Sequence, residues 1–293
     1  MYKINQLCLN KTKTINTLYM SNIYQIYLIS DSTGETLDRI FTAIKAQFKN
    51  IDYKIHTYSF TRTENQILKI LSNAKENQNS IILYSIVDSS LAKYLASNSE
   101  EKKIPCFGVL GDLILSFSKL LNQKASHQPS GQYTLNDEYY KRIEAIQFTM
   151  NHDDGNLVKD IKKSDIILLG VSRTSKTPTS IYLANKGYKI SNIPLVNENS
   201  IPETLKEDPN LTCIVGLSTE AERLVEIRKN RMNLLKESQN KSYTDLSNIK
   251  KEVEEAKNTF KKYRWPIIDV TRKSVEETAA SIIKIYEIYK NNG

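Results

Sequence analysis

The stretch that decides the fold is Asp165-Ile-Ile-Leu-Leu-Gly170-Val-Ser-Arg-Thr-Ser-Lys176-Thr177-Pro178. It begins with an apolar run over residues 166–169, which is too short for a helix and predicts a buried strand. Gly170 ends the run, and a helical pattern follows the Lys-Thr pair and ends at Gly187. A strand, a glycine-led loop, Lys-Thr and a helix are typical of a phosphate-binding loop, G-x-x-x-x-G-K-[ST].

This loop is the candidate nucleotide-binding site because its backbone N–H groups and the helix dipole would favour an anion. Lys176 is suited to reach the terminal phosphates, and the Thr177 hydroxyl is suited to bind Mg²⁺. Arg173 is suited to fork onto a phosphate. The candidate nucleotide-binding residues are Gly170, Val171, Ser172, Arg173, Thr174, Ser175, Lys176 and Thr177.

One position departs from the phosphate-loop pattern, because Ser175 stands where the pattern has its last glycine. A position that needs a positive φ penalises serine, so the path of the loop is expected to differ from the standard one. A polar turn followed by a capped helix is the alternative interpretation. The strand before the loop and the helix after it favour phosphate binding.

The composition is that of an ordinary globular protein, with 293 residues, 40% hydrophobic and 25% charged. A net charge of +8 fits an acidic ligand such as a nucleotide. No interleaved basic and aromatic motif predicts nucleic-acid binding. The three cysteines are far apart and form neither a metal spacing nor a disulfide framework, which favours a reducing cytoplasm. No apolar run predicts a membrane span or a signal peptide.

Strand and helix patterns alternate along the chain, which predicts an α/β protein with parallel-sheet strand–helix units. Residues 1–22 are polar and weakly patterned, and residues 122–136 interrupt the alternation as a linker or mobile loop. Residues 230–263 are rich in charged side chains and predict helices with a solvated surface. The expected organisation is an extension over 1–22, an N-terminal α/β domain over 23–121, the loop over 122–136 and a P-loop-like phosphotransfer domain over 137–293.

Two other polar constellations are candidates for chemistry. The turn that contains Ser32, Thr33 and Gly34 lies between a predicted strand and a helix, so it is a possible second phosphate site; a helix cap without a ligand is at least as good an interpretation. His152 is followed by Asp153 and Asp154 at a predicted helix end. Two acids oppose the dipole at that end, which favours a function such as proton transfer or Mg²⁺ binding.

Several motifs together resemble one known family, the bacterial and plant pyruvate, phosphate dikinase regulatory proteins with the related phosphoenolpyruvate synthase regulatory proteins. The resemblance runs in order from about Ile23 to the C-terminus. It is carried by residues 29–36, by residues 139–146 leading to His-Asp-Asp-Gly at 152–155, by the phosphate loop, and by residues 265–271 and 274–279.

This resemblance implies a bifunctional serine/threonine kinase and phosphorylase. Such an enzyme uses ADP to phosphorylate a threonine on the target dikinase, and inorganic phosphate to remove it with release of pyrophosphate. Lys176 and Arg173 would neutralise charge, and Asp153 or Asp154 would act as the base while the other orients Mg²⁺, with Thr177 and Asp154 as candidate ligands. A homodimer is also expected.

Two rival classes of function stay open from the sequence. One is an ATP-dependent P-loop kinase of a small molecule, and the other is a nucleotide-sensing module without catalysis. Within the family, the target is either pyruvate, phosphate dikinase or phosphoenolpyruvate synthase. Nucleotide choice and transfer to a protein separate these possibilities.

Overall fold

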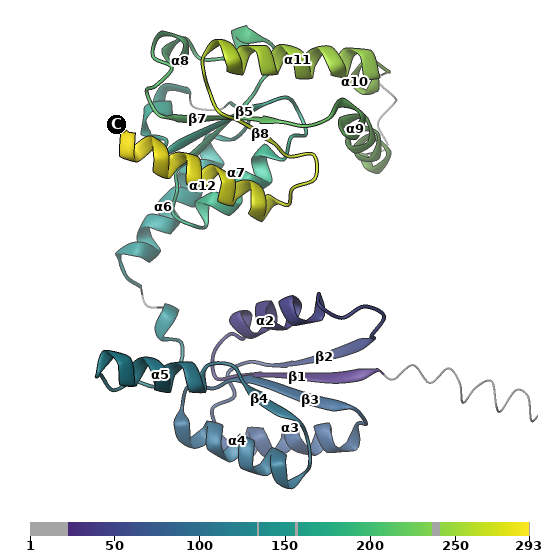
Figure 1. The fold of residues 1–293 in the computed structure, drawn as a ribbon, viewed down its shortest axis with the longest axis vertical. Coiled ribbons are helices and arrows are strands. Elements are labelled where there is room, and N and C mark those ends of the chain that lie inside the picture. The colour runs from purple at the N-terminus through teal and green to yellow at the C-terminus, as the bar shows by residue number, and fades with distance from the viewer. Residues whose placement is uncertain (1–22, 134, 156–157, 236–240, 293) are drawn as a thin grey trace, which may run out of the picture. The chain divides into compact units, whose positions relative to one another are not determined.

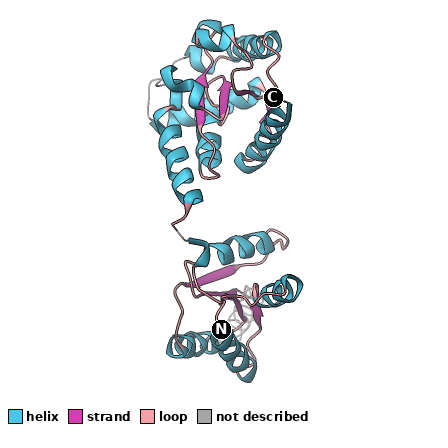
Figure 2. Cartoon of the chain, turned by 90° about the vertical axis from the view of Figure 1, so that its left-hand side faces the viewer, coloured by secondary structure: helices cyan, strands magenta, loops and turns pink. Residues whose placement is uncertain are grey.

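The structure is a computed structural model that describes residues 23–133, 135–155, 158–235 and 241–292. The chain divides into two compact units, residues 1–134 and 135–293 (Figures 1 and 2). The predicted extension over 1–22 lies outside the described residues. Each unit holds a four-stranded sheet in which every pairing is parallel. The α/β class with one such domain in each half of the chain is therefore confirmed.

The first unit is built on a sheet with the strand order β2-β1-β3-β4. The central strand β1 is buried over most of its length because side chains on both of its faces enter apolar clusters, Ile26 and Leu28 on one side and Tyr27 and Ile29 on the other. The elements are β1 (Tyr24–Ser30), α2 (Glu35–Lys45), β2 (Tyr53–Tyr58), α3 (Glu64–Glu76), β3 (Ser80–Ser85), α4 (Ser89–Glu101), β4 (Cys106–Gly108), α5 (Gly111–Leu121) and a 3-10 turn η1 (Gly131–Tyr133).

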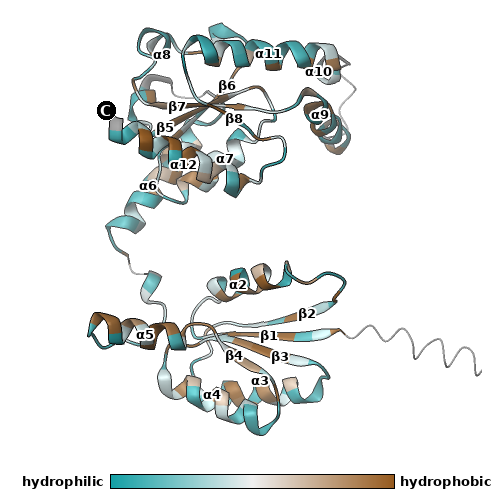
Figure 3. Cartoon of the chain, viewed as in Figure 1, coloured by the Kyte–Doolittle hydropathy of each residue, from teal (hydrophilic) through white to brown (hydrophobic). Residues whose placement is uncertain are grey.

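Helix α5, which the sequence analysis did not predict, is apolar along most of its length (Figure 3). None of its residues is buried, and Leu120 is 82% exposed. It therefore adds nothing to the core of the first unit. After α5, the described part of the segment predicted as a loop contains the η1 turn and no other helix or strand. It contacts the turn after β1 at Ser130, whose hydroxyl lies 2.9 Å from that of Ser32.

The second unit repeats the arrangement with the strand order β6-β5-β7-β8. Ser274 and Glu277 form a reciprocal capping box at the start of its last helix. The elements are α6 (Asp137–Asn151), η2 (Asp153–Gly155), η3 (Val158–Lys163), β5 (Ile166–Gly170), α7 (Lys176–Ala184), β6 (Ile190–Pro194), η4 (Glu198–Ser200), α8 (Glu203–Glu207), β7 (Cys213–Ser218), α9 (Ala221–Leu235), α10 (Lys241–Thr244), α11 (Leu246–Lys262), β8 (Ile267–Asp269) and α12 (Val275–Asn292).

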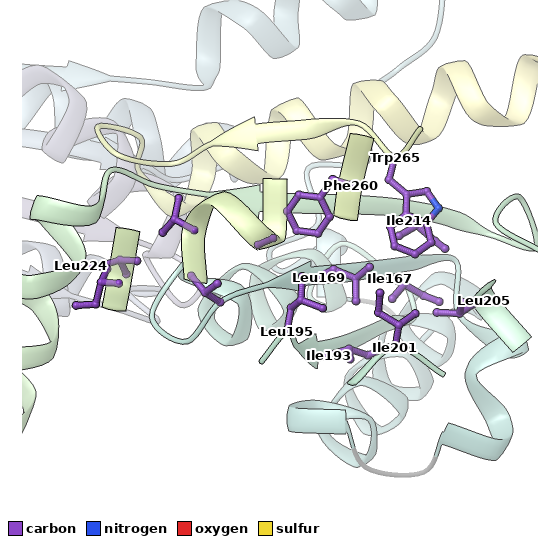
Figure 4. Packing of buried hydrophobic residues seen from close by; sticks show 14 of the residues in the cluster. Ile167, Leu169, Ile193, Leu195, Ile201, Leu205, Ile214, Leu224, Phe260 and Trp265 are labelled. Atoms are coloured by element: carbon purple, nitrogen blue, oxygen red, sulfur yellow. The ribbon is translucent and has the colours of Figure 1, made fainter. Parts of the chain in front are cut away.

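Strand β5 holds the centre of this unit because both of its faces are covered. Ile167 and Leu169 enter the cluster beneath α8, α9 and α11, which Figure 4 shows around Phe260 and Trp265. Ile166 and Leu168 alternate with them and enter the cluster beneath α7 and α12. A buried strand of this kind reads as a continuous apolar run rather than as an alternation of apolar and polar residues. The rigid centre fixes the position of the loop that follows Gly170.

No helix in the described ranges combines the length and the apolar character needed to cross a bilayer.

Candidate functional site

The phosphate-loop segment leaves the sheet of the second unit at its topological switch point. Strand β5 lies between β6 and β7, and the chain passes from β5 through α7 to β6 on one side and later enters β7 on the other. In open parallel sheets, ligands bind beyond the carboxyl ends of the strands at such a point. The loop that begins at Gly170 is thus at the position where this fold binds ligands.

Gly170 is required by close packing at the start of the loop. A Cβ atom at this position would lie 2.7 Å from the Leu217 carbonyl oxygen and 2.7 Å from Thr174 Oγ1. Real Cβ atoms do not approach backbone this closely, so only glycine lets the loop turn back against β7. The Thr174 hydroxyl in turn donates to the Val171 carbonyl at 3.0 Å, which closes the loop on itself.

The backbone of the loop has two residues in the left-handed region. Arg173 has a φ of 75°, and Ser175 has a φ of 58°. Ser175 thus adopts the conformation in which glycine is favoured, at a cost on the order of 1 kcal/mol. It occupies the N-cap position of α7, and no side chain caps that end of the helix. Alternating right- and left-handed residues next to a helix N-terminus form a concave set of N–H donors, which suits an anion.

Lys176 is buried at the base of the loop, with 6% of its surface exposed. Its Nζ donates to the Val171 carbonyl at 3.0 Å. Burial lowers the pKa of Lys176 from 10.5 to about 8, although the charges of Asp154 and Asp153 oppose this shift. A bound phosphate would supply the negative charge that this ammonium group lacks.

Asp153 belongs to the same cluster as the loop, although it precedes β5 in the sequence. Its Oδ1 accepts from Thr177 Oγ1 at 3.2 Å and makes a short contact with Asn192 Nδ2. The Asn192 amide also donates to Thr177 Oγ1 at 3.0 Å. The structure therefore brings Thr177 to Asp153 rather than to Asp154, and adds Asn192, which the sequence analysis did not identify. The available signal was a polar residue within strand β6, which also contains Ser191.

Asp154 differs from its neighbour because it is exposed and has a φ of 52°. Its charge still acts on Lys176, where it is the largest influence that raises the pKa. His152 turns away from both acids: its Nδ1 bonds to the Phe148 carbonyl at 2.8 Å and its ring stacks on that of Phe148. The imidazole therefore completes the end of α6, and Asp154 presents its carboxylate at the surface.

Two residues from α9 and α10 that the sequence analysis assigned to no site also contact the loop. Arg173 Nε donates to Tyr243 Oη at 3.4 Å, and Ser172 Oγ lies 3.4 Å from the same atom. Arg228 is buried and donates to the Ser172 carbonyl at 3.4 Å. Burial raises the pKa of Tyr243. The hydrogen bonds with Ser172 and Arg173 and the charges of Arg173 and Arg228 together lower it by more, so the pKa of Tyr243 is below its usual value.

The turn of the first unit that contains Ser32, Thr33 and Gly34 lines a separate cavity of about 170 Å³. The cavity lies at the carboxyl ends of β1 and β3, the switch point of that sheet, at the N-terminus of α2. The buried Asp31 carboxylate accepts from the Val87 N–H at 2.7 Å and also lines this space. Phosphate binding here stays a prediction.

Comparisons with known proteins show the family of this chain. The sequence pattern described as kinase/pyrophosphorylase matches residues 26–283. The chain belongs to the kinase/pyrophosphorylase family. The match spans both units, including the loop, the two acids and the segment with Arg228 and Tyr243. Family membership makes the protein a phosphotransferase.

Curated relatives cover nearly the whole chain. A protein of Pelagibacter ubique (strain HTCC1062) named "Putative pyruvate, phosphate dikinase regulatory protein" is 74% identical over 94% of this chain and 100% of its own. Proteins of the same name from Wolbachia sp. subsp. Brugia malayi (strain TRS) and Geotalea uraniireducens (strain Rf4) are 42% and 41% identical, over 89% and 90% of this chain and 96% and 97% of theirs. A periplasmic solute-binding protein of Actinobacillus succinogenes, at 12% identity, covers 92% of each chain with a TM-score of 0.24, too low to relate the folds.

Proposed function

We propose that this protein is a bifunctional enzyme that phosphorylates a threonine of pyruvate, phosphate dikinase with ADP and removes that phosphate with inorganic phosphate. The names of the curated relatives support the dikinase as the target. The family's description as kinase and pyrophosphorylase supports two phosphoryl transfers. The single observation that carries the proposal is the cluster at the phosphate loop, where buried Lys176 and the Thr177–Asp153 pair lie beside exposed Asp154.

In the forward direction, the threonine oxygen forms a bond to the terminal phosphorus of ADP, the bond to the bridging oxygen breaks, and AMP leaves. In the reverse activity, an oxygen of inorganic phosphate forms a bond to the phosphothreonine phosphorus and the bond to the threonine oxygen breaks. That oxygen takes a proton, pyrophosphate leaves, and the dikinase regains its unmodified threonine side chain. Such transfers need alignment and charge stabilisation more than covalent help from the protein. One cradle for two adjacent phosphoryl groups serves both reactions, since ADP and pyrophosphate each carry a diphosphate.

Each residue of the cluster has a role that follows from its surroundings. Lys176 and Arg173 neutralise charge on the phosphoryl oxygens. Asp154 is the base that takes the threonine proton, because its exposed carboxylate can meet a hydroxyl on another protein. Asp153 is held by Thr177 and Asn192, so it positions the site rather than accepts that proton.

A magnesium ion fits the oxygen donors next to the loop. Thr177 Oγ1 and the Asp153 carboxylate are hard ligands, and the buried Asn192 Oδ1 lacks a hydrogen-bond partner among the described residues. The described ranges hold no group of three His, Cys, Asp or Glu side chains arranged for a metal. Magnesium commonly takes few protein ligands and completes its shell with water and substrate phosphates. Thr177 and Asp153 would hold the ion, with Asn192 beside them, and the ion would neutralise phosphate charge.

The test mixes the protein with each purified dikinase, pyruvate, phosphate dikinase or phosphoenolpyruvate synthase, and with ADP labelled on its terminal phosphate. We expect label on a threonine of the first target, then pyrophosphate release when phosphate is added. Asp154→Asn should bind ADP and transfer nothing, whereas Lys176→Ala should lose ADP binding. Label on phosphoenolpyruvate synthase alone would change the target, and ADP binding without transfer to either would contradict the proposed enzyme.

An ATP-dependent transfer to a small molecule would instead favour the rival P-loop kinase. The homodimer and the cytoplasmic location expected from the sequence stay predictions.

A further inference from the structure

Arg228 on α9 is a buried cation that the proposed reaction does not use. The Arg228 side chain is 1% exposed, while its partner Glu252 on α11 is 38% exposed. Arg228 Nη2 donates to Glu252 Oε2 at 2.7 Å, and Nη1 lies 3.4 Å from Oε1. Even a paired buried guanidinium adds little net stability, because desolvation offsets the attraction between the charges, so a role beyond stability is worth seeking.

Arg228 also binds two backbone carbonyls, and one of them belongs to the phosphate loop. It donates to the Tyr243 carbonyl at 3.2 Å and to the Ser172 carbonyl at 3.4 Å. In a trans peptide, the carbonyl and the next N–H point in opposite directions. Because the Ser172 carbonyl points towards Arg228, the N–H of Arg173 in the same peptide unit points away from Arg228. That residue is also in the left-handed region, as a concave set of N–H donors requires.

Tyr243 connects the same buried cation to the side chain of Arg173. Its ring lies 4.6 Å from the Arg228 guanidinium carbon, and its hydroxyl accepts from Arg173 Nε at 3.4 Å. The contact uses Nε and leaves the terminal nitrogens of Arg173 available to a phosphate. No hydrogen bond within the described residues engages those nitrogens.

We propose that Arg228 and Tyr243 are positioning residues of the diphosphate site: Arg228 orients the loop peptide that follows Ser172, and Tyr243 aims the Arg173 guanidinium. This inference rests on the proposed function and deepens it. The charged segment at residues 230–263 then takes part in substrate binding through its α10 turn. Arg228 acts on binding because it sets the backbone donors, and Tyr243 acts on transfer because it sets a cation that neutralises developing charge.

The first test measures ADP binding by calorimetry for Arg228→Lys and for a matched control, Arg223→Lys. Arg223 is on the same helix, is exposed, and pairs only with Glu226 three residues away among the described residues. Lysine keeps the charge of Arg228 but cannot donate to Glu252 and two carbonyls in one plane, so we expect the Kd for ADP to rise about tenfold. The control should match the wild type. Because partial reversible unfolding would by itself raise the apparent Kd, circular dichroism at the titration temperature must first show that both variants are fully folded.

The second test is a double-mutant cycle between Tyr243→Phe and Arg173→Ala. The Tyr243→Phe substitution removes a single oxygen atom, so this test does not require the fold to tolerate a change of the buried Arg228. We expect Tyr243→Phe to lower kcat for transfer about fivefold with KM for ADP nearly unchanged, and to have almost no effect once Arg173 is absent. Additive effects of the two substitutions, or an unchanged Kd in folded Arg228→Lys, would overturn the inference while the proposed function stands. A wild-type protein that bound no ADP would overturn both.

Discussion

Replacing Lys176 by Met should stabilise the protein while it abolishes nucleotide binding. The Lys176 ammonium group is buried, and this burial lowers its pKa from 10.5 to about 8. At about 1.36 kcal/mol per pKa unit, holding the charged group in the folded state near pH 7 costs about 3 kcal/mol. Methionine loses the hydrogen bond to the Val171 carbonyl, worth about 1 kcal/mol, but has a similar length and no charge. The net expectation is a gain of about 2 kcal/mol.

Denaturant unfolding at pH 7, together with calorimetric titration of ADP, measures both halves of this prediction. The gain should be fully present below pH 8, where Lys176 is protonated in the folded and the unfolded states. Between pH 8 and 10.5 the unfolded chain binds the extra proton, so the wild type gains stability with pH and the advantage of Lys176→Met disappears. Lys176→Arg, which keeps its charge, should show no such gain. A Lys176→Met protein that is less stable at pH 7, or that still binds ADP, would refute the reasoning.

Two further substitutions test the shape of the loop. Gly170→Ala places a methyl group 2.7 Å from the Leu217 carbonyl oxygen and from Thr174 Oγ1, so it should lower the free energy of unfolding by about 2 kcal/mol or more and weaken ADP binding. Gly111→Ala is the control, because a Cβ atom at Gly111 meets nothing within 4 Å. Equal effects of the two substitutions would contradict the packing argument. Ser175→Gly should raise the free energy of unfolding by up to about 1 kcal/mol, because Ser175 has a φ of 58° and glycine adopts a positive φ without strain. Transfer activity should be retained. A loss of activity would show that the Ser175 side chain takes part in the reaction.

The sequence was most informative where the signal was local. The apolar run before Gly170 and the Lys-Thr pair each lie within a few residues, and the strand and the helix start were found at the expected places. Local signals of this kind follow directly from backbone preferences and side-chain periodicity. The exposed helix α5 was missed although its apolar residues follow a helical period, and none of its residues is buried.

The sequence alone determined that this chain forms parallel α/β units and that Gly170 and the Lys-Thr pair join a buried strand to a helix, since strand, turn and helix are encoded in consecutive residues. Only the tertiary structure decided which acid meets Thr177, because Asp153 and Asn192 reach it from 24 and 15 residues away. The same holds for Arg228, which lies 56 residues from Ser172. Such contacts depend on strand order and on the register of helices packed over the sheet, which no local pattern in the sequence encodes.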